Sequence, residues 1–123
     1  MECGVDIIEI RRIKQAVDKH GEKFLNRIFT DKEIEYCKSK GVQSYASYAV
    51  RFAAKESVGK LLKTGFDGNI AWKEIEVNNI EGGAPEIVLY GNTKKIASQK
   101  KINDIKISLS HSREYAISMV IGY

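Results

Sequence analysis

A long helical run bounded by Ser44 and Gly65 constrains the fold of this chain more than any other stretch. At roughly 100° per residue, one apolar stripe along the run consists of Ala54, Val58, Leu61 and Leu62. Such a stripe predicts a helix that packs one face against a core.

Glu56 lies on the side of this predicted helix that faces away from the stripe, between Lys60 and Lys63. Its neighbours on that side are all small: Ala49, Ala53 and Gly59. Because a solvated face usually carries longer polar side chains, small residues around one carboxylate would let another molecule approach the helix. A surface ion pair explains the stretch equally simply, since Glu56 and Lys60 at i and i+4 would stabilise a helix by ~0.3 kcal/mol.

Size and composition fit one globular domain over residues 1–123, with 43% hydrophobic and 29% charged residues. A net charge of +4 favours an anionic partner but does not select among nucleic acids, phosphates and acidic proteins. The two cysteines have no metal-ligand spacing and are too few for a disulfide framework, which favours the cytoplasm. No signal-like N-terminus and no run near the roughly 20 apolar residues of a membrane span is present, so we expect no membrane association.

Periodicity divides the chain into a helical first half and a second half of strands. In the first half we expect a strand over 1–8, a helix that follows it to about residue 19, and a short helix around 24–28. We then expect a helix that begins with the T-x-x-E capping box of Thr30 and ends at Gly41, followed by the run over 44–65. In the second half we expect strands over 71–77, 86–90, 105–110 and 115–121, a loop over 78–85, a connection over 111–114 and a helix capped by Asn92 that runs to about residue 100. The predicted class is α+β, with a mainly antiparallel sheet and one helix packed on it.

Asp6 is an acid among the apolar residues of the first expected strand. It could form a D-x-x-E capping box with Glu9 at the start of the following helix. Alternatively, Asp6 belongs with Glu56 and His111 to a set of ionisable side chains at positions that structure alone does not require. Two carboxylates far apart in sequence suit Mg²⁺, which takes one or two protein carboxylates and completes its shell with water and phosphate oxygens.

His111 lies in the sequence S-L-S-H-S-R at the end of an expected strand. Its role could be structural, but the hydroxyls and the arginine around it would also make a set of hydrogen-bond donors for a phosphate. Further cations beside Glu56 would come from Arg51, Lys55 and Lys60. An acid that holds a metal and cations that neutralise oxygens are what a Mg²⁺–pyrophosphate complex needs. No P-loop and no G-x-G-x-x-G motif occurs, so neither a P-loop enzyme nor a Rossmann domain is predicted.

Four motifs together resemble the bacterial holo-[acyl-carrier-protein] synthases, the small phosphopantetheinyl transferases. In order along the chain they are G-V-D-I-I-E-I-R-R-I at 4–13, F-T-D-K-E at 29–33, R-F-A-A-K-E-S at 51–57 and S-L-S-H-S at 108–112. The resemblance extends from residue 4 to about residue 122. G-x-D-I and R-x-A-A-K-E about fifty residues apart make it specific.

The resemblance implies that the chain transfers 4'-phosphopantetheine from CoA to a serine of apo acyl carrier protein, which releases adenosine 3',5'-bisphosphate. It implies Mg²⁺ as the cofactor, with Asp6 and Glu56 as the metal ligands and these two acids and Lys60 as the catalytic set. The CoA contacts that it implies are Arg51, Lys60, Gly65, Pro85, His111 and Ser112. It also implies a carrier-protein surface around Arg12 and Arg27, and a homotrimer with active sites at the subunit interfaces.

This sequence departs from the family pattern at Ser57, Lys63 and Ala84, where alanine, glycine and a basic residue are commoner. Two other classes of function are compatible with a small basic domain. A nucleic-acid-binding domain is disfavoured, because basic residues interleaved with exposed aromatics are not evident and no recognised motif appears. A non-catalytic carrier-protein adaptor would bind the carrier protein but would not respond to CoA and Mg²⁺.

Overall fold

The computed structural model describes residues 1–80 and 83–123, so Glu81 and Gly82 of the expected loop over 78–85 lie outside the described residues. The helices are α1 (Ile10–His20), α2 (Glu22–Ile28), α3 (Asp31–Lys38), α4 (Ser44–Leu62) and α5 (Gly91–Gln99), with 3-10 turns η1 (Gly41–Gln43) and η2 (Trp72–Glu74). The strands are β1 (Glu2–Glu9), β2 (Ile75–Asn79), β3 (Pro85–Leu89), β4 (Ile105–His111) and β5 (Tyr115–Gly122). This order confirms the predicted α+β class.

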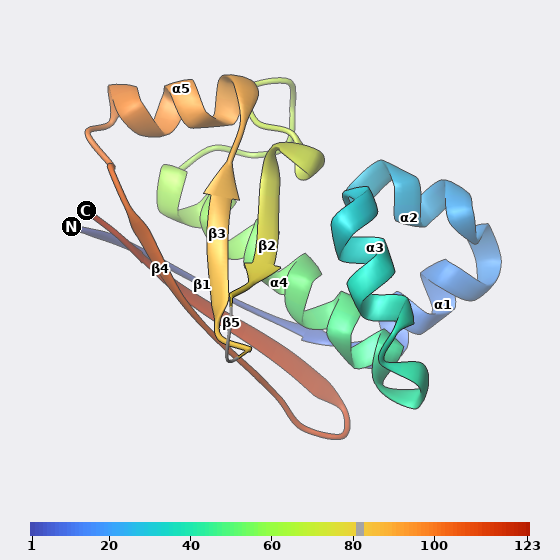
Figure 1. Cartoon of the computed structure of the whole chain (residues 1–123). Helices are drawn as coiled ribbons and strands as arrows, with labels where there is room; N and C mark the ends of the chain where they lie inside the picture. The colour runs from blue at the N-terminus through green and yellow to red at the C-terminus, as the bar shows by residue number, and fades with distance from the viewer. Residues whose placement is uncertain (81–82) are drawn as a thin grey trace.

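The strands form two antiparallel sheets rather than one (Figure 1). The larger sheet has the order β1-β5-β4, and its register places Asp6 opposite Ser118. The smaller sheet pairs β2 with β3. Helices α1 to α3 gather at one end of the molecule, α5 lies toward the other, and the two termini lie side by side on the paired ends of β1 and β5 (Figure 1).

Helix α4 is the element that both cores share. One core packs α1, α2, α3 and the first half of α4 around Phe29 and Tyr48. The other packs the second half of α4 against both sheets around Leu61, Leu62 and Ile75. Full burial of a leucine or isoleucine contributes about 1.5–3 kcal/mol, so this helix is held on nearly every side.

The strand β1 runs very close to α4 at Gly4. A Cβ at this position would lie 2.0 Å from the carbonyl oxygen of Ser57, so only glycine allows the contact. Ser57 is itself buried and shares a 2.9 Å hydrogen bond with Ser118 of β5. The unusual Ser57 therefore fastens α4 to the larger sheet, and the close approach at Gly4 brings Asp6 beside α4.

The outer face of β1 and β5 in the larger sheet, opposite α4, is apolar and exposed. The register alternates buried residues such as Ala116 and Val120 with residues that face outward. The large exposed apolar residues on this face are Val5, Ile7, Tyr115, Ile117 and Met119. The strand β4 adds exposed polar residues to the same face: Lys106, Ser108 and Ser110. The apolar side of β1 therefore does not face the core of the chain.

Local signals predicted the elements better than the contacts between them. The Thr30 capping box is confirmed, because the Thr30 hydroxyl accepts from the Glu33 amide and the Glu33 carboxylate accepts from the Thr30 amide. The alternative capping box at Asp6 is wrong, because Asp6 lies within β1 and α1 begins only at Ile10.

Three further expectations about the second half need correction. The strand expected over 71–77 begins at Ile75, because residues 72–74 form the turn η2. Asn92 does not cap α5; instead, the distant Glu74 carboxylate accepts from the Asn92 and Thr93 amides. His111 is the last residue of β4 rather than part of a connection.

Within the described residues, no helix has the length and apolarity that a membrane span requires.

Candidate functional site

Asp6 and Lys60 meet where β1 passes α4. The Lys60 Nζ donates to the Asp6 carboxylate at 3.0 Å and to the Val5 carbonyl oxygen at 2.9 Å. The expected surface pair of Lys60 with Glu56 is therefore wrong: in the part of the chain that the structure describes, the ion pair of Lys60 goes to Asp6. The reason is the close approach at Gly4, which brings a carboxylate and a carbonyl oxygen within reach of the same ammonium group.

Glu56 is partly buried on α4 and is not paired with Lys60. Burial raises the pKa of Glu56 above its usual value, the nearby Asp6 charge raises it further, and Lys60 opposes the shift. Two carboxylates that repel each other in a half-buried position are a donor set that a divalent cation would stabilise. The described residues contain no cluster of three or more potential metal ligands, so this donor set is of the size that Mg²⁺ uses together with water and phosphate oxygens.

A cavity of about 390 Å³ opens beside these acids. It is lined by Glu56, Gly59, Lys60, Lys63, Thr64, Gly65 and Phe66. The structure thus places the predicted Gly65 with Glu56 and Lys60. Of the small residues expected to leave this face open, Ala49 and Ala53 are instead fully buried by the protein's own chain, and only Gly59 lines the cavity.

The end of α4 explains the departure at Lys63. Lys63 adopts the left-handed conformation, with φ 59°, as the residue that ends the helix. Glycine is the residue that takes this conformation at least cost, which accounts for the commoner glycine there. Gly65, which we expected to end the helix, lies two residues further along.

A second cavity, of about 550 Å³, collects Arg51, Pro85 and His111. Arg51 is 3% exposed, and its guanidinium donates to the Ser47 hydroxyl at 3.0 Å and to the Asn79 side chain. The Arg51 Nε is buried without a hydrogen-bond partner among the described residues. Arg51 therefore lines this cavity as a nearly buried cation whose position is fixed by Ser47 and Asn79.

This cavity is also lined by side chains that were not predicted from the sequence. Tyr36 lies under two cations, with the Arg51 guanidinium 4.3 Å and the Lys40 ammonium 4.6 Å from its ring centre. Asn79 accepts from Arg51 and donates to the Gly83 carbonyl oxygen at 2.9 Å. No sequence pattern marked these residues, because only the fold brings α3 and β2 to Arg51.

Ser112 lies apart from this cavity. It lines a neighbouring one of about 750 Å³, which it shares with His111 and the first turn of α1. Its hydroxyl accepts from the Glu114 and Tyr115 amides at 3.3 and 3.1 Å and so closes the β4–β5 hairpin. His111 borders both cavities, so of the two predicted residues only His111 lines the cavity of Arg51.

The predicted site residues therefore fall into two groups. Arg51 and Glu56 are five residues apart on α4, which turns them by about 140° around the helix axis. The cavity of Glu56 and the cavity of Arg51 share no lining residue in the described chain. The candidate residues therefore occupy two separate cavities, here called the two half-sites.

Arg12 and Arg27 are both exposed, on α1 and α2. Among the described residues neither takes part in an ion pair, although the neighbouring Arg11 and Lys14 do. Both guanidinium groups are therefore available to an acidic partner.

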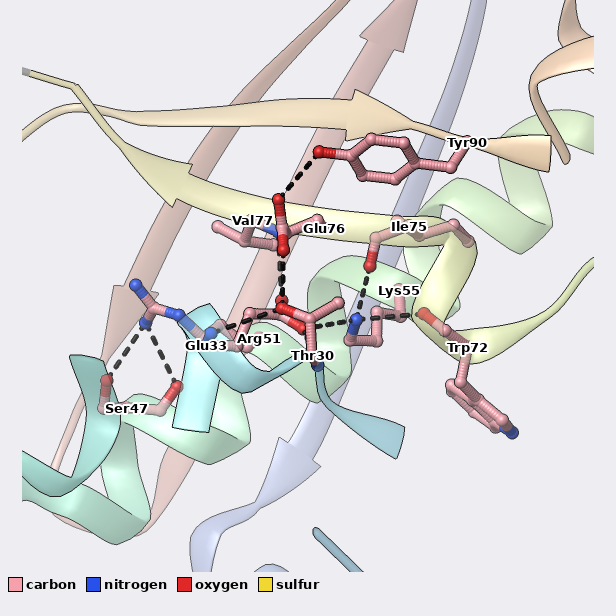
Figure 2. Close-up of polar contacts among 10 residues, drawn as sticks. All are labelled: Thr30, Glu33, Ser47, Arg51, Lys55, Trp72, Ile75, Glu76, Val77 and Tyr90. Atoms are coloured by element: carbon pink, nitrogen blue, oxygen red, sulfur yellow. Dashed lines mark hydrogen bonds and ion pairs between the residues drawn. The ribbon is translucent and has the colours of Figure 1, made fainter. Parts of the chain in front are cut away.

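Lys55 was expected among the cations beside Glu56, and this prediction is wrong. Its side chain and that of Glu33 are both fully buried, and the Lys55 Nζ donates to the Glu33 carboxylate at 2.8 Å (Figure 2). Burial lowers the pKa of Lys55, and the Glu33 carboxylate opposes that shift. This pair could not be predicted from the sequence, because the capping box fully explained the T-x-x-E motif of Glu33.

A second buried carboxylate, Glu76, adjoins this pair (Figure 2). It accepts from the Thr30 hydroxyl at 2.6 Å and from the Tyr90 hydroxyl at 3.0 Å. Although burial acts to raise the pKa of Glu76, these hydrogen bonds outweigh burial and hold it below the usual value. The network joins α3, α4 and the smaller sheet.

Comparison with known proteins gives matches over almost the whole chain. Residues 2–120 match the 4'-phosphopantetheinyl transferase superfamily. The holo-[acyl-carrier-protein] synthase of Thermoanaerobacter sp. (strain X514) is 50% identical over 119 residues, which cover 97% of this chain and 84% of that protein. The synthase of Halothermothrix orenii is 44% identical over 119 residues, which cover 97% and 94%.

Solved structures show the same fold. The Helicobacter pylori holo-[acyl-carrier-protein] synthase in complex with coenzyme A superposes with a TM-score of 0.87 at 31% identity, covering 98% of this chain and 99% of that one. The Neisseria meningitidis synthase gives a TM-score of 0.90 at 27% identity, covering 99% and 97%.

Proposed function

This chain belongs to the 4'-phosphopantetheinyl transferase superfamily, and from that premise we propose that it acts as a holo-[acyl-carrier-protein] synthase. It transfers 4'-phosphopantetheine from CoA to a serine of apo acyl carrier protein and gives holo carrier protein and adenosine 3',5'-bisphosphate. The observation that carries the assignment is the meeting of Asp6, Lys60 and Glu56, from two elements far apart in sequence, beside an open cavity.

Asp6 and Glu56 would hold Mg²⁺, since Glu56 lines this cavity and the charge of Asp6 acts on Glu56 from the adjacent strand β1. When bound, the ion would neutralise the pyrophosphate oxygens of CoA and polarise the attacked phosphorus. Lys60 is 55% exposed at its side chain, so its ammonium can turn from Asp6 toward phosphate oxygens. The attacking hydroxyl arrives on the carrier protein, so the chain needs no covalent nucleophile of its own, and positioning and charge supply the catalysis.

The cavity of Arg51, Pro85 and His111 would take the nucleotide end of CoA, with Ser112 in support from the adjoining hairpin. Arg51 and His111 offer donors to phosphate oxygens, and Lys40 adds a further cation beside Arg51. Gly65 and Lys60 would contact CoA from the other half-site. One CoA molecule can use both half-sites only if they come from two protomers.

A homotrimer with sites at its interfaces meets that need. The exposed apolar face of β1 and β5, with Val5, Ile7, Ile117 and Met119, supplies a surface that a second copy would bury. A cyclic assembly repeats one heterologous contact around a ring, and this would place the Arg51 cavity of each protomer beside the Glu56 cavity of the next.

The exposed Arg12 and Arg27 would bind the acidic carrier protein, whose charge complements the basic surface of α1 and α2. Residues 1–123 act as one phosphopantetheinyl transferase domain, because both cores share α4. We place the enzyme in the cytoplasm, where the exposed Cys3 and the buried Cys37 stay reduced.

The test is mass spectrometry of apo acyl carrier protein incubated with the purified chain, CoA and Mg²⁺. The carrier should gain the mass of one phosphopantetheine, and Glu56→Gln should abolish the gain while its circular dichroism matches that of the unchanged protein. A carrier that keeps its mass with the unchanged enzyme refutes the transfer. Full activity of Glu56→Gln would instead move the metal site elsewhere.

A further inference from the structure

Lys55 is a fully buried lysine in the middle of α4, one residue before Glu56. Its ammonium donates to the Glu33 carboxylate at 2.8 Å, to the Trp72 carbonyl oxygen at 3.0 Å and to the Ile75 carbonyl oxygen (Figure 2). A lysine has three N–H donors, so each one goes to a different element: α3, η2 and β2. One side chain thus fastens three elements to the helix that carries Glu56.

A buried ion pair is a poor means of stabilising a fold, because desolvation offsets most of its attraction. A methionine at position 55 would fill a similar volume, but it would leave the buried Glu33 carboxylate without its cation. It would also lose the hydrogen bonds to the carbonyl oxygens of Trp72 and Ile75, which flank the turn η2. The lysine therefore supplies a fixed position for this turn.

The turn carries an aromatic stack that reaches the cavity of Glu56. The Trp72 ring lies 3.6 Å from the Phe66 ring at an interplanar angle of 3°, and 5.1 Å from the Phe52 ring at 22°. Phe66 lines the cavity together with Glu56 and Lys60. Gly59 packs beside this stack, since a Cβ there would lie 3.2 Å from the Thr64 carbonyl oxygen and 3.4 Å from the Phe66 ring. A continuous path of contacts thus links the Lys55 ammonium to the cavity wall.

We propose that Lys55 is a positioning residue for the transfer reaction. By holding the Trp72 carbonyl oxygen, it fixes the stack of Trp72 on Phe66 and so sets the wall against which substrate lies beside Glu56 and Lys60. Lys55 touches no substrate itself. This role rests on the proposed function, and its first test does not depend on activity.

The first test uses Trp72 as a reporter, because it is the single tryptophan of the chain. In Lys55→Met we expect tryptophan emission at longer wavelength and stronger quenching by acrylamide, at temperatures where circular dichroism shows a folded protein. The matched control is Lys38→Met, which removes an exposed lysine paired to Glu22 at 2.9 Å and should leave the emission unchanged. Unchanged emission and quenching in folded Lys55→Met would overturn the proposal.

The second test separates positioning from stability by kinetics with CoA and apo carrier protein. Folded Lys55→Met should lose between about ten- and a hundred-fold in kcat, the loss that a misplacement of about 1 Å can cause, with KM for CoA changed much less. The Lys38→Met control should keep its kcat. A merely structural Lys55 predicts an unaltered kcat for the folded fraction.

Phe66→Leu covers the case in which Lys55→Met does not fold, because it opens the stack and leaves the Lys55 contacts in place. It should reproduce the loss of kcat while its unfolding temperature stays near that of the unchanged protein. A normal kcat in Phe66→Leu would overturn the proposal. An unchanged enzyme that transfers nothing would refute the proposed function instead, and the emission of Trp72 would still decide whether Lys55 holds the turn.

Discussion

At the scale of single residues, the charges of the site are unevenly matched. Lys60 neutralises Asp6, which is 17% exposed at its side chain, while Glu56 keeps a raised pKa caused first by burial and then by Asp6. A divalent cation held by Asp6 and Glu56 would compete with the Lys60 ammonium for Asp6. Lys60 would then be released toward the phosphates, so a single lysine can serve both the empty and the loaded site.

Glu76 provides a test of the buried network through pH. Its folded pKa lies below the unfolded value of 4.5, so the ionised carboxylate stabilises the fold above about pH 4.5 and this stabilisation is lost as pH falls through the lower folded pKa. Glu76→Gln should therefore lower the free energy of unfolding at pH 7 by about 1–3 kcal/mol, the range for a hydrogen bond to a charged group. Calorimetry across pH 3–7 should show the gap to the unchanged protein shrinking below about pH 4.

Glu86→Gln is the matched control, because Glu86 lies on the neighbouring strand β3 and is exposed. It should show no comparable gap at pH 7. If Glu76→Gln differed from the unchanged protein equally at pH 3 and pH 7, the ionised form of Glu76 would not be the source of the stabilisation.

At the scale of elements, α1 carries the proposed carrier-protein surface. Arg12→Glu should raise KM for the carrier protein by about ten-fold, because it turns an attraction into a repulsion at an exposed contact, with little change in KM for CoA. The matched control is Lys95→Glu, which makes the same change of charge on exposed α5 at the other end of the molecule (Figure 1). Steady-state kinetics with varied carrier protein would measure both, and an equal rise in both variants would exclude a docking site at Arg12.

Sequence predicted those elements whose signals are local. The Thr30 capping box and the alternation of β4 were correct because each depends on neighbours a few residues apart. The role of Lys55 escaped prediction because its acceptors lie 17 to 22 residues away, on elements that only folding brings together. The cap of α5 was missed for the same reason, since Glu74 supplies it from outside the helix.

The structure brings the two candidate acids, Asp6 and Glu56, near each other, but their partners were not predicted. Asp6 and Glu56 could be recognised as candidates because folding alone does not explain an acid in an apolar strand or an acid among small residues. The pairing of Lys60 with Asp6 depends on the contact of Gly4 with α4, which no spacing in the sequence encodes.

At the scale of the whole molecule, we propose that each chain contributes two half-sites, which face different ways around α4. The half-site of Glu56 and Lys60 and the half-site of Arg51 and His111 lie in separate cavities. The exposed apolar face of the larger sheet supplies a surface on which copies could assemble. Each active site would then need side chains from two protomers.

The most direct measurement is the mass of the carrier protein after reaction with mixed protomers of Glu56→Gln and Arg51→Gln. Each variant alone should be folded and inactive. Co-expressed in equal amounts, they should regain about a quarter of the unchanged activity, because about one interface in four would then combine an intact Glu56 with an intact Arg51 from the neighbouring protomer. A mixture that leaves the carrier mass unchanged would contradict the shared site, because a site within one protomer carries a lesion in every copy.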